Sequence, residues 1–288
     1  MAYNYATKYE KEISDILRQE SLTGILETPN VNWTGAKTFV QKTLSTSGYK
    51  PHTRTVGWNM GQITDDEIPY TLEFDRDIQF FVDKADVDET NEALTAGNVT
   101  AQFMREQAIP EIDAYRFSKI ATKAISLSQT AAETVTKADI FGKLKDAFLK
   151  IRKYGASNMV TFISSEAMDC LERSTDFNRS VSTEKIGNIE TRVASIDGVR
   201  LIEVWDDDRF KTKYDFTDGF VPDSTAKDIN FMVVAKPAII AKTKISSIYL
   251  FPAGAHTEGD GWLYQNRIYH DLFVNKLMED GIYVSTKE

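Results

Sequence analysis

Apolar residues recur at helical spacing along two stretches of the chain. A residue on every third or fourth position lies on one face of a helix, so both stretches predict amphipathic helices. The longer helix is expected at about residues 93–126, from Val99, Phe103, Ala108, Ile112, Phe117, Ile120, Ala121 and Ala124. Pro110 falls inside it and should kink or split it, because proline lacks a backbone N–H and clashes with the preceding turn. The second helix is expected after Thr136, from Ile140, Leu144, Ala147, Phe148 and Ile151.

Runs of β-branched and aromatic residues predict strands before and after these helices. The expected strands lie at residues 38–40, 70–82, 159–163, 189–195, 199–205, 229–235, 238–242, 262–274 and 282–284. Asp197-Gly198 stands between two of them and is a strong hairpin signal. Residues 282–284 should return after a turn, and the strand at 70–82 is the natural partner for this C-terminal segment. Helices and strands together predict an α+β fold.

A long polar stretch at residues 45–69 carries apolar side chains that a solvated loop has no reason to keep. These are Trp58, Met60 and Ile63. About twenty-five residues of loop are unusual inside one domain, and such loops are usually functional or ordered by something outside the monomer. An extended hairpin lying over another subunit explains both observations. A flexible insertion or a substrate lid remains the alternative.

The first thirty residues have the character of an arm. Residues 8–20 predict a polar helix whose apolar stripe, formed by Ile13, Ile16 and Leu17, is too narrow to anchor a domain of its own. We expect Ile13 and Leu17 to pack on a neighbouring subunit, with a frayed terminus as the alternative.

Composition narrows the class of protein. The chain has 288 residues, 42% hydrophobic and 27% charged, enough for one large or two modest domains with a core. It has neither an apolar run of roughly 18 residues nor a signal-peptide pattern, so we expect no membrane partner. Cys170 is the only cysteine, which excludes an intrachain disulfide and favours a reducing cytoplasm.

Charge adds a constraint and one candidate surface. A net charge of −9 argues against a protein that mainly grips bare nucleic acid, although a shell around DNA meets phosphate only on its inner face. Four basic residues of the long helix fall near one angular sector, namely Arg105, Arg116, Lys119 and Lys123. Such a row is usually a solvated face, and inward-facing DNA contact is the functional alternative.

The sequence offers no catalytic, metal-binding or cofactor-binding motif. Phosphate-binding glycine loops, a dinucleotide fingerprint and a zinc-protease motif are all absent, and Ser164 and Ser165 lack the glycines of a nucleophile elbow. Cys170 is expected to be a small core residue. Asp206, Asp207 and Asp208 could hold Mg²⁺ for phosphoryl transfer, but adjacent strand positions point to opposite faces, and a solvated acidic loop is the plainer interpretation.

Three segments resemble the major capsid proteins of tailed bacteriophages, the Hong Kong 97-type fold, and in particular those of siphophages of Gram-positive bacteria. The segments are residues 80–91 (FFVDKADVDETN) leading into the long helix, residues 236–241 (KPAIIA), and residues 267–274 (RIYHDLFV) followed by 280–284 (DGIYV). Each is moderately specific, and their order and spacing carry the resemblance across nearly the whole chain.

The resemblance implies a division of the chain and a set of partners. It implies an N-terminal arm (1–33), an extended E-loop (34–72), a P-domain with a spine helix (73–129 and 241–288) and an inserted A-domain (130–240). A non-enzymatic virion protein is then expected, assembled in the host bacterial cytoplasm as hexamers and pentamers of an icosahedral shell around double-stranded DNA. Its other expected partners are a portal protein and a separate scaffolding protein. Lys42, Lys50 and Asn266 have suitable types for an inter-subunit isopeptide bond, but nothing singles them out.

Other functions stay open at this stage. An encapsulin-like shell that holds cargo enzymes has the same fold. A metal-dependent phosphoesterase that uses Asp206–Asp208 is the alternative from another class, and a tail-tube or head-completion protein is a third.

Overall fold

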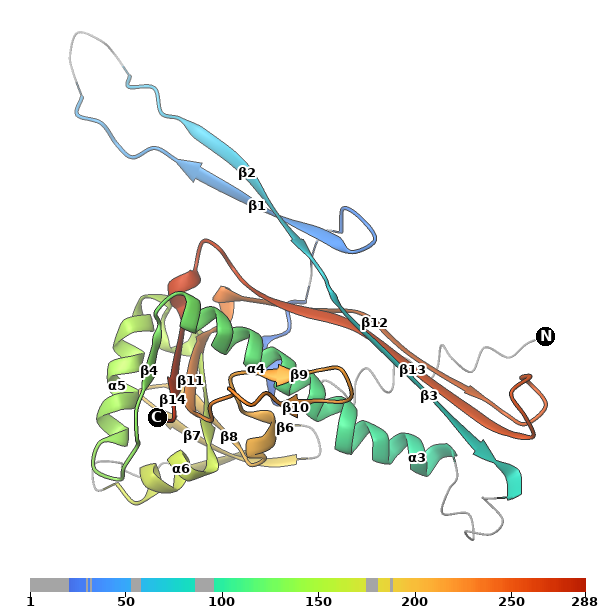
Figure 1. Ribbon diagram of the computed structural model, residues 1–288. Coiled ribbons are helices and arrows are strands. Elements are labelled where there is room, and N and C mark those ends of the chain that lie inside the picture. The colour runs from blue at the N-terminus through green and yellow to red at the C-terminus, as the bar shows by residue number, and fades with distance from the viewer. Residues whose placement is uncertain are drawn as a thin grey trace.

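The computed structural model describes residues 21–29, 31, 33–52, 58–85, 96–174, 181–186 and 189–288 (Figure 1). The predicted helix at residues 8–20, with Ile13 and Leu17, lies outside these residues. Within them, the chain forms a seven-stranded sheet with helices on both faces, a long three-stranded sheet and a separate hairpin.

The seven-stranded sheet is built mainly from the middle of the chain. Its order is β4 (Thr130–Ala132), β14 (Ile282–Thr286), β11 (Ile229–Ala235), β5 (Met159–Ser164), β8 (Val199–Val204), β7 (Ile189–Ile196) and β6 (Val181–Ile186). Its central strands are buried along their whole length, as expected for strands covered on both faces. The predicted turn at Asp197-Gly198 is confirmed, since both residues adopt positive φ (52° and 78°) between β7 and β8.

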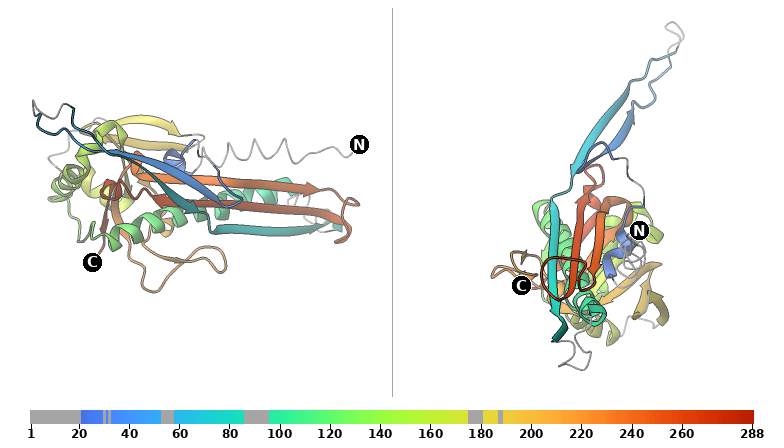
Figure 2. Two further views of the ribbon diagram at one scale, coloured as in Figure 1. Left: turned by 90° about the horizontal axis from the view of Figure 1, so that it is seen from above. Right: turned by 90° about the vertical axis from the view of Figure 1, so that its right-hand side faces the viewer.

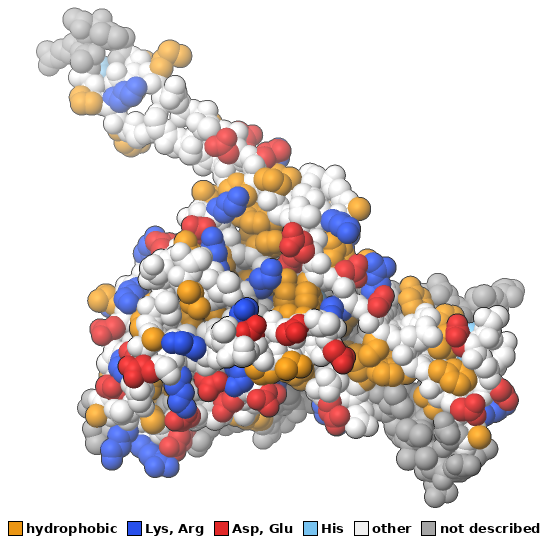
Figure 3. All heavy atoms as spheres, viewed as in Figure 1, with side chains coloured by type: hydrophobic (Ala, Val, Ile, Leu, Met, Phe, Trp, Pro, Cys, Tyr) orange, Lys and Arg blue, Asp and Glu red, His pale blue; other side chains and the backbone are white. Residues whose placement is uncertain are grey.

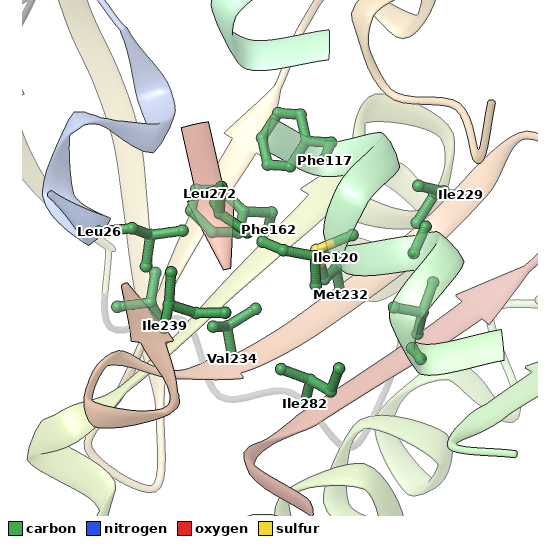
Figure 4. Packing of buried hydrophobic residues seen from close by; sticks show 14 of the residues in the cluster. Leu26, Phe117, Ile120, Phe162, Ile229, Met232, Val234, Ile239, Leu272 and Ile282 are labelled. Carbon is green, nitrogen blue, oxygen red and sulfur yellow. The ribbon is translucent and has the colours of Figure 1, made fainter. Parts of the chain in front are cut away.

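Helices cover the two faces of this sheet with alternate residues of the same strands. Met232 and Val234 of β11 pack toward α4 (Ile109–Ser126), beside Phe117 and Ile120 (Figure 4). Phe231 and Val233, their neighbours along the strand, pack toward α5 (Ile140–Ile151) and α6 (Ser165–Glu172). The two-residue period of a strand thus divides the apolar residues between two cores. The Ser164 hydroxyl accepts a hydrogen bond from the Ala167 N–H (3.3 Å) and so caps the N-terminus of α6.

The predicted long helix is split, as Pro110 requires. The first part, α3 (Ala96–Phe103), is followed by one π turn (Met104–Ala108) before α4 begins. Pro110 occupies the first turn of α4, where its missing N–H leaves no internal hydrogen bond unmade. The Ile109 N–H bonds to the Met104 carbonyl, five residues back, so the π turn absorbs the change of register.

The three-stranded sheet is ordered β12 (Ile239–Phe251), β13 (Gly261–Val274) and β3 (Phe74–Asp83), all antiparallel. The predicted pairing of residues 262–274 with the strand at 70–82 is therefore confirmed. One face of the sheet packs on the π turn and the start of α4, through Tyr264 and Ile268 against Met104 and Ile112. Figure 2 shows this sheet as a long layer running alongside the helix.

The predicted place of the C-terminal strand is wrong. β14 pairs with β11 and β4 in the seven-stranded sheet, and not with the strand at 70–82. All five of its residues are buried, which only a strand covered on both faces achieves. Among the described residues, the three-stranded sheet has an α-helix on one face alone. A short 3-10 turn, η7 (Glu279–Gly281), redirects the chain between the two sheets.

The hairpin is longer than predicted. β1 (Thr38–Thr46) and β2 (Ile63–Thr71) pair over nine residues, so much of the expected loop at 45–69 is strand. Sequence alone hid β2, because it contains three successive acidic residues and Pro69, which an edge strand tolerates. Figures 1 and 2 show the hairpin projecting away from both sheets. Among the described residues, no helix has the length and apolar character to span a membrane.

Phe117→Ala should lower the free energy of unfolding by about 3–5 kcal/mol, because it leaves a cavity among fully buried residues. Phe117 contacts Phe162 and Phe210 with ring centroids 5.0 and 4.9 Å apart. Ile125→Ala on the same helix is the control, since Ile125 is 48% exposed and its loss should cost only about 0.5 kcal/mol. Denaturant unfolding of both variants measures the difference, and equal losses would contradict this account of the core.

Candidate interaction surfaces

The outer part of the hairpin exposes large apolar side chains. Trp58 is 96% exposed, Met60 89% and Ile63 73%, and Tyr49 is fully exposed beside them. Hydrogen bonds hold the two chain segments together beyond the paired strands, from Asn59 Nδ2 to the Pro51 carbonyl (2.9 Å) and from the Ser47 N–H to the Gln62 carbonyl (3.0 Å). Figure 3 shows apolar side chains along the surface of this projection. The hairpin thus presents apolar surface that the described part of its own chain does not cover.

The base of the hairpin is fixed to the body by aromatic packing. Phe39 and Tyr70, one from each strand, stack with ring centroids 5.5 Å apart and both contact Phe273 of β13. Leu72, Ile240 and Tyr269 complete this buried cluster. The direction in which the hairpin leaves the body is therefore set by a packed core and not by a loose loop.

A buried carboxylate ties the residues that follow the N-terminal segment to α4. Asp113 of α4 is fully buried and accepts hydrogen bonds from the backbone N–H of Leu22 (3.0 Å) and of Thr23 (3.1 Å). The hydroxyls of Ser21 and Thr23 also donate to it, and Arg209 lies 3.4 Å away. The short 3-10 helix η1 (Leu22–Leu26) is thereby held against α4, beside the main core.

The prediction that Arg116 shares an exposed face with the other three basic residues is wrong. Its side chain is 3% exposed and points inward, donating to the carbonyl and hydroxyl of Thr23 (3.4 and 3.3 Å) and to the Thr243 hydroxyl (3.3 Å). Arg105 and Lys119 are exposed, and Lys123 is half-buried with its Nζ 2.7 Å from a Glu279 oxygen. Arg116 stands one turn after Ile112 and one turn before Ile120, on the buried face of α4, so three of the four residues remain on the surface.

A second buried polar group joins α4 to β13. Tyr115 Oη donates to Asp271 Oδ1 (2.8 Å), and the Glu73 N–H donates to the other oxygen of the same carboxylate (3.0 Å). Burial, together with the charge of Asp271, raises the pKa of Tyr115, so the phenol stays protonated. His270 packs edge-on against the stacked rings of Phe74 and Tyr115. Burial, reinforced by the charge of Arg116, lowers the pKa of His270 well below 6.5. The imidazole is neutral at physiological pH.

A cavity of about 470 Å³ opens between β3, the start of α4 and the loop at residues 216–219. Its apolar wall is formed by Ile78, Phe80, Phe103, Ala108, Ile112 and Ile268. Asp77 and Asp218 also line it, and Asn266 and His270 are the buried polar residues on its wall. Sequence analysis did not find this cavity, because its residues come from four distant segments.

The acidic triplet forms a solvated turn, in agreement with the plainer interpretation. Asp206 Oδ1 accepts a hydrogen bond from the Asp208 N–H (3.1 Å) at the start of the 3-10 helix η5 (Asp207–Arg209). Burial and the nearby charge of Asp228 raise the pKa of Asp207. Within the described ranges, no group of three or more His, Cys, Asp or Glu side chains is placed to hold a metal ion.

Cys170 and the three residues considered for an isopeptide bond have ordinary environments. Cys170 is half-buried beside the α5–α6 core, and burial raises the pKa of its thiol, which disfavours the reactive thiolate. Lys42 is paired with Glu67 (3.2 Å) and Lys50 donates to the Met60 carbonyl (3.3 Å). Asn266 is 4% exposed within the three-stranded sheet.

Comparison with known proteins identifies the fold. No family model and no curated protein sequence matches the chain. Among solved structures, the capsid structure of cyanophage P-SCSP1u matches with a TM-score of 0.65 and 12% identity, over 91% of this chain and 86% of that one. The mature capsid of bacteriophage PhiM1 matches with a TM-score of 0.60 and 12% identity, over 88% and 82% of the two chains. A structure from Gordonia phage Cozz matches with a TM-score of 0.59 and 15% identity, over 93% and 86%.

These matches confirm the α+β phage-capsid fold expected from the sequence. At such low identity the likeness concerns the fold.

Asp113→Ala should lower the free energy of unfolding by about 3–5 kcal/mol, because it leaves buried donors and a positive charge without their acceptor. Hydrogen exchange at the Leu22 and Thr23 amides should accelerate more than exchange in β11. Asp146→Ala removes an exposed aspartate of α5 and serves as the control. Unchanged protection at Leu22 and Thr23 would contradict the anchoring role of Asp113.

Stability should fall as the pH drops below 6.5, because of His270. The unfolded chain binds a proton near pH 6.5 while the folded protein does not, so unfolding takes up a proton and stability rises with pH in this window. The contribution approaches one proton, roughly 1.4 kcal/mol per pH unit. His270→Gln should remove this part of the slope, and His52→Gln, at an exposed position of the hairpin, should not. Denaturant midpoints between pH 5 and 7 measure it, and an unchanged slope in His270→Gln would refute the assignment.

Proposed function

We propose that the protein is the major capsid protein of a tailed bacteriophage, a non-enzymatic subunit that self-assembles into an icosahedral shell around double-stranded DNA. The observation that carries the proposal is the fold match, which spans more than four fifths of both chains in each comparison above. A match of that extent involves most of the chain, and not a single common motif.

The proposal assigns a role to each part of the chain. Residues 1–33 are the N-terminal arm, 34–72 the E-loop, 73–129 and 241–288 the P-domain with its spine helix, and 130–240 the A-domain. One adjustment follows from the strand order: β14 belongs with the A-domain sheet, since it pairs with β11 and β4. In this scheme A-domains gather around the axes of hexamers and pentamers.

The hairpin supports the proposal physically. One large aromatic side chain buries about 150–250 Å², which at about 25 cal/mol per Å² is worth roughly 4–6 kcal/mol before the entropic costs of association. Trp58 and Tyr49 are both fully or almost fully exposed, so covering them with a neighbouring copy would yield a substantial part of an interface energy. The same residues would serve no purpose on a monomer.

Contact with DNA is assigned to surface lysine and arginine residues only. Arg105, Lys119 and Lys123 are the candidates on the inner face, and Arg116 is excluded because its guanidinium is committed to Thr23 and Thr243. With a net charge of −9, the chain suits enclosure of DNA better than tight binding. A separate scaffolding protein and a portal protein complete the assembly in the bacterial cytoplasm.

Electron microscopy and sedimentation of the purified protein, alone and co-expressed with the candidate scaffolding protein, test the proposal. Closed shells, tubes or capsomers are expected in at least one condition. Monomers in every condition, accompanied by hydrolysis of a phosphodiester substrate, would overturn it. Disassembled shells should show no such activity.

Removing apolar side chains from the outer hairpin should weaken assembly and leave the monomer intact. In the double variant Tyr49→Ser, Met60→Ser we expect the critical concentration for assembly to rise at least tenfold, with an unchanged thermal midpoint. Leu149→Ser, which removes a 65% exposed leucine from α5, is the control. If the unmodified protein, the double variant and Leu149→Ser all assemble at the same concentration, the outer hairpin has no role in shell formation.

A further inference from the structure

The cavity beside β3 is held open by a side chain of the strand itself. Arg76 donates from Nε to Glu111 Oε1 of α4 (2.8 Å), and from Nη1 to the Phe216 carbonyl. Its other nitrogen, Nη2, lies 3.4 Å from the Gly219 carbonyl, where φ is +68°. Arg76 thus braces the loop at 216–219 against the strand and the helix, so the cavity is part of the fold's own hydrogen-bonding scheme.

The cavity wall carries a buried polar atom that lacks a partner. Asn266 is 4% exposed, and its Nδ2 lies near Tyr264 Oη (3.1 Å) and Met104 Sδ (3.4 Å), while Oδ1 has no hydrogen bond. Exchanging the two amide atoms does not help, since Tyr264 Oη can donate or accept and the other amide atom still has none. A buried acceptor left this way costs about 1–3 kcal/mol, and an incoming donor would recover that energy once the Asn266 amide turned toward the cavity.

The rim of the cavity and the outer part of the hairpin carry opposite charges. Asp77 and Asp218 line the cavity with no ion pair among the described residues, and Asp75 is bound by Arg267 (2.6 Å). Between Leu44 and Thr64 the sequence contains Lys50 and Arg54 and no acidic residue. The outer part of the hairpin therefore brings aromatic rings and positive charge, and the cavity offers an apolar wall with an acidic rim.

We propose that this cavity is the socket for Trp58 of a second copy of the chain. Trp58 is the largest of the exposed hairpin side chains, and its indole N–H is a donor with no acceptor role, which matches the free oxygen of Asn266. A volume of about 470 Å³ accommodates an indole, and Phe80 and Phe103 provide aromatic faces for it. This inference rests on the proposed shell function and names the receiving surface.

The contact is heterologous, since the hairpin of one copy meets a different surface on the next. Such contacts close into rings when the rotation between copies is right and otherwise form open filaments. The socket lies beside β3 and the start of α4, whereas the hairpin extends away from the body (Figure 1). Insertion within one chain is therefore not the arrangement observed, and a neighbour is needed.

A cross-link between copies tests the socket. In a Cys170→Ser background, one preparation carries Met60→Cys, which keeps Trp58, and the other carries Gln107→Cys at an exposed position lining the cavity. The two are co-assembled, oxidised with copper–phenanthroline and digested, and the linked peptides are quantified by mass spectrometry. We expect the 60–107 link to exceed at least tenfold the link formed when Asp146→Cys replaces Gln107→Cys. Adding Trp58→Ala to the Met60→Cys chain should reduce the 60–107 link at least tenfold.

The outcomes separate the socket from the proposed function. If shells or capsomers form but the 60–107 link is no stronger than the 60–146 link, the socket is wrong. The proposed shell function would then still stand. A strong 60–107 link that persists with Trp58→Ala would overturn Trp58 as the anchor. If the unmodified protein forms no assembly with or without a scaffold, the shell function and the socket both fail.

Discussion

The architecture depends on one helix that packs against two different sheets. The first turns of α4 place Ile109 and Ile112 against the three-stranded sheet, and the later turns place Phe117 and Ile120 against the seven-stranded sheet. Asp113 and Arg116 lie between these apolar groups and form hydrogen bonds with residues from other segments. Removing the helix would leave each sheet with an uncovered apolar face, so the position of the two sheets relative to each other depends on it.

Much of this arrangement was readable from the sequence where local signals were strong. Pro110 predicted the break in the long helix, and Asp197-Gly198 predicted the tight hairpin, because both depend on backbone chemistry within a few residues. The assignment of Val160 and Phe162 to a buried strand was equally local. Long-range choices were harder: Ile282–Thr286 has a strand sequence, and nothing within it says which of two sheets it joins.

The spacing of residues along α4 indicates that Asp113 and Arg116 point inward, whereas the prediction placed Arg116 on an exposed face. Arg116 stands four residues after Ile112 and four before Ile120, and Asp113 stands four before Phe117, so both share the apolar face of the helix. Two charged residues on an apolar stripe indicate buried partners rather than a solvated row. The partners themselves, Ser21 and Thr23, lie about ninety residues away, and spacing along the helix cannot identify them. The cavity beside β3 could not be predicted for the same reason, because its lining residues come from segments far apart in the sequence.

Besides the passage through α4, the chain crosses between the sheets twice, and these two crossings lie against each other. The chain passes from β11 to β12 through the 3-10 turn η6 (Lys236–Ala238), and from β13 to β14 through the turn that ends at Gly281. Asn275 N–H bonds to the Ala238 carbonyl (2.8 Å), and a Cβ at position 281 would stand 2.4 Å from Ala238 Cβ. Tension applied between the two sheets would thus be carried in part by two adjacent stretches of backbone, packed so closely that no side chain fits between them. If the protein is pulled apart along this direction, the contact at Ala238 and Gly281 is one place where the load passes from one sheet to the other.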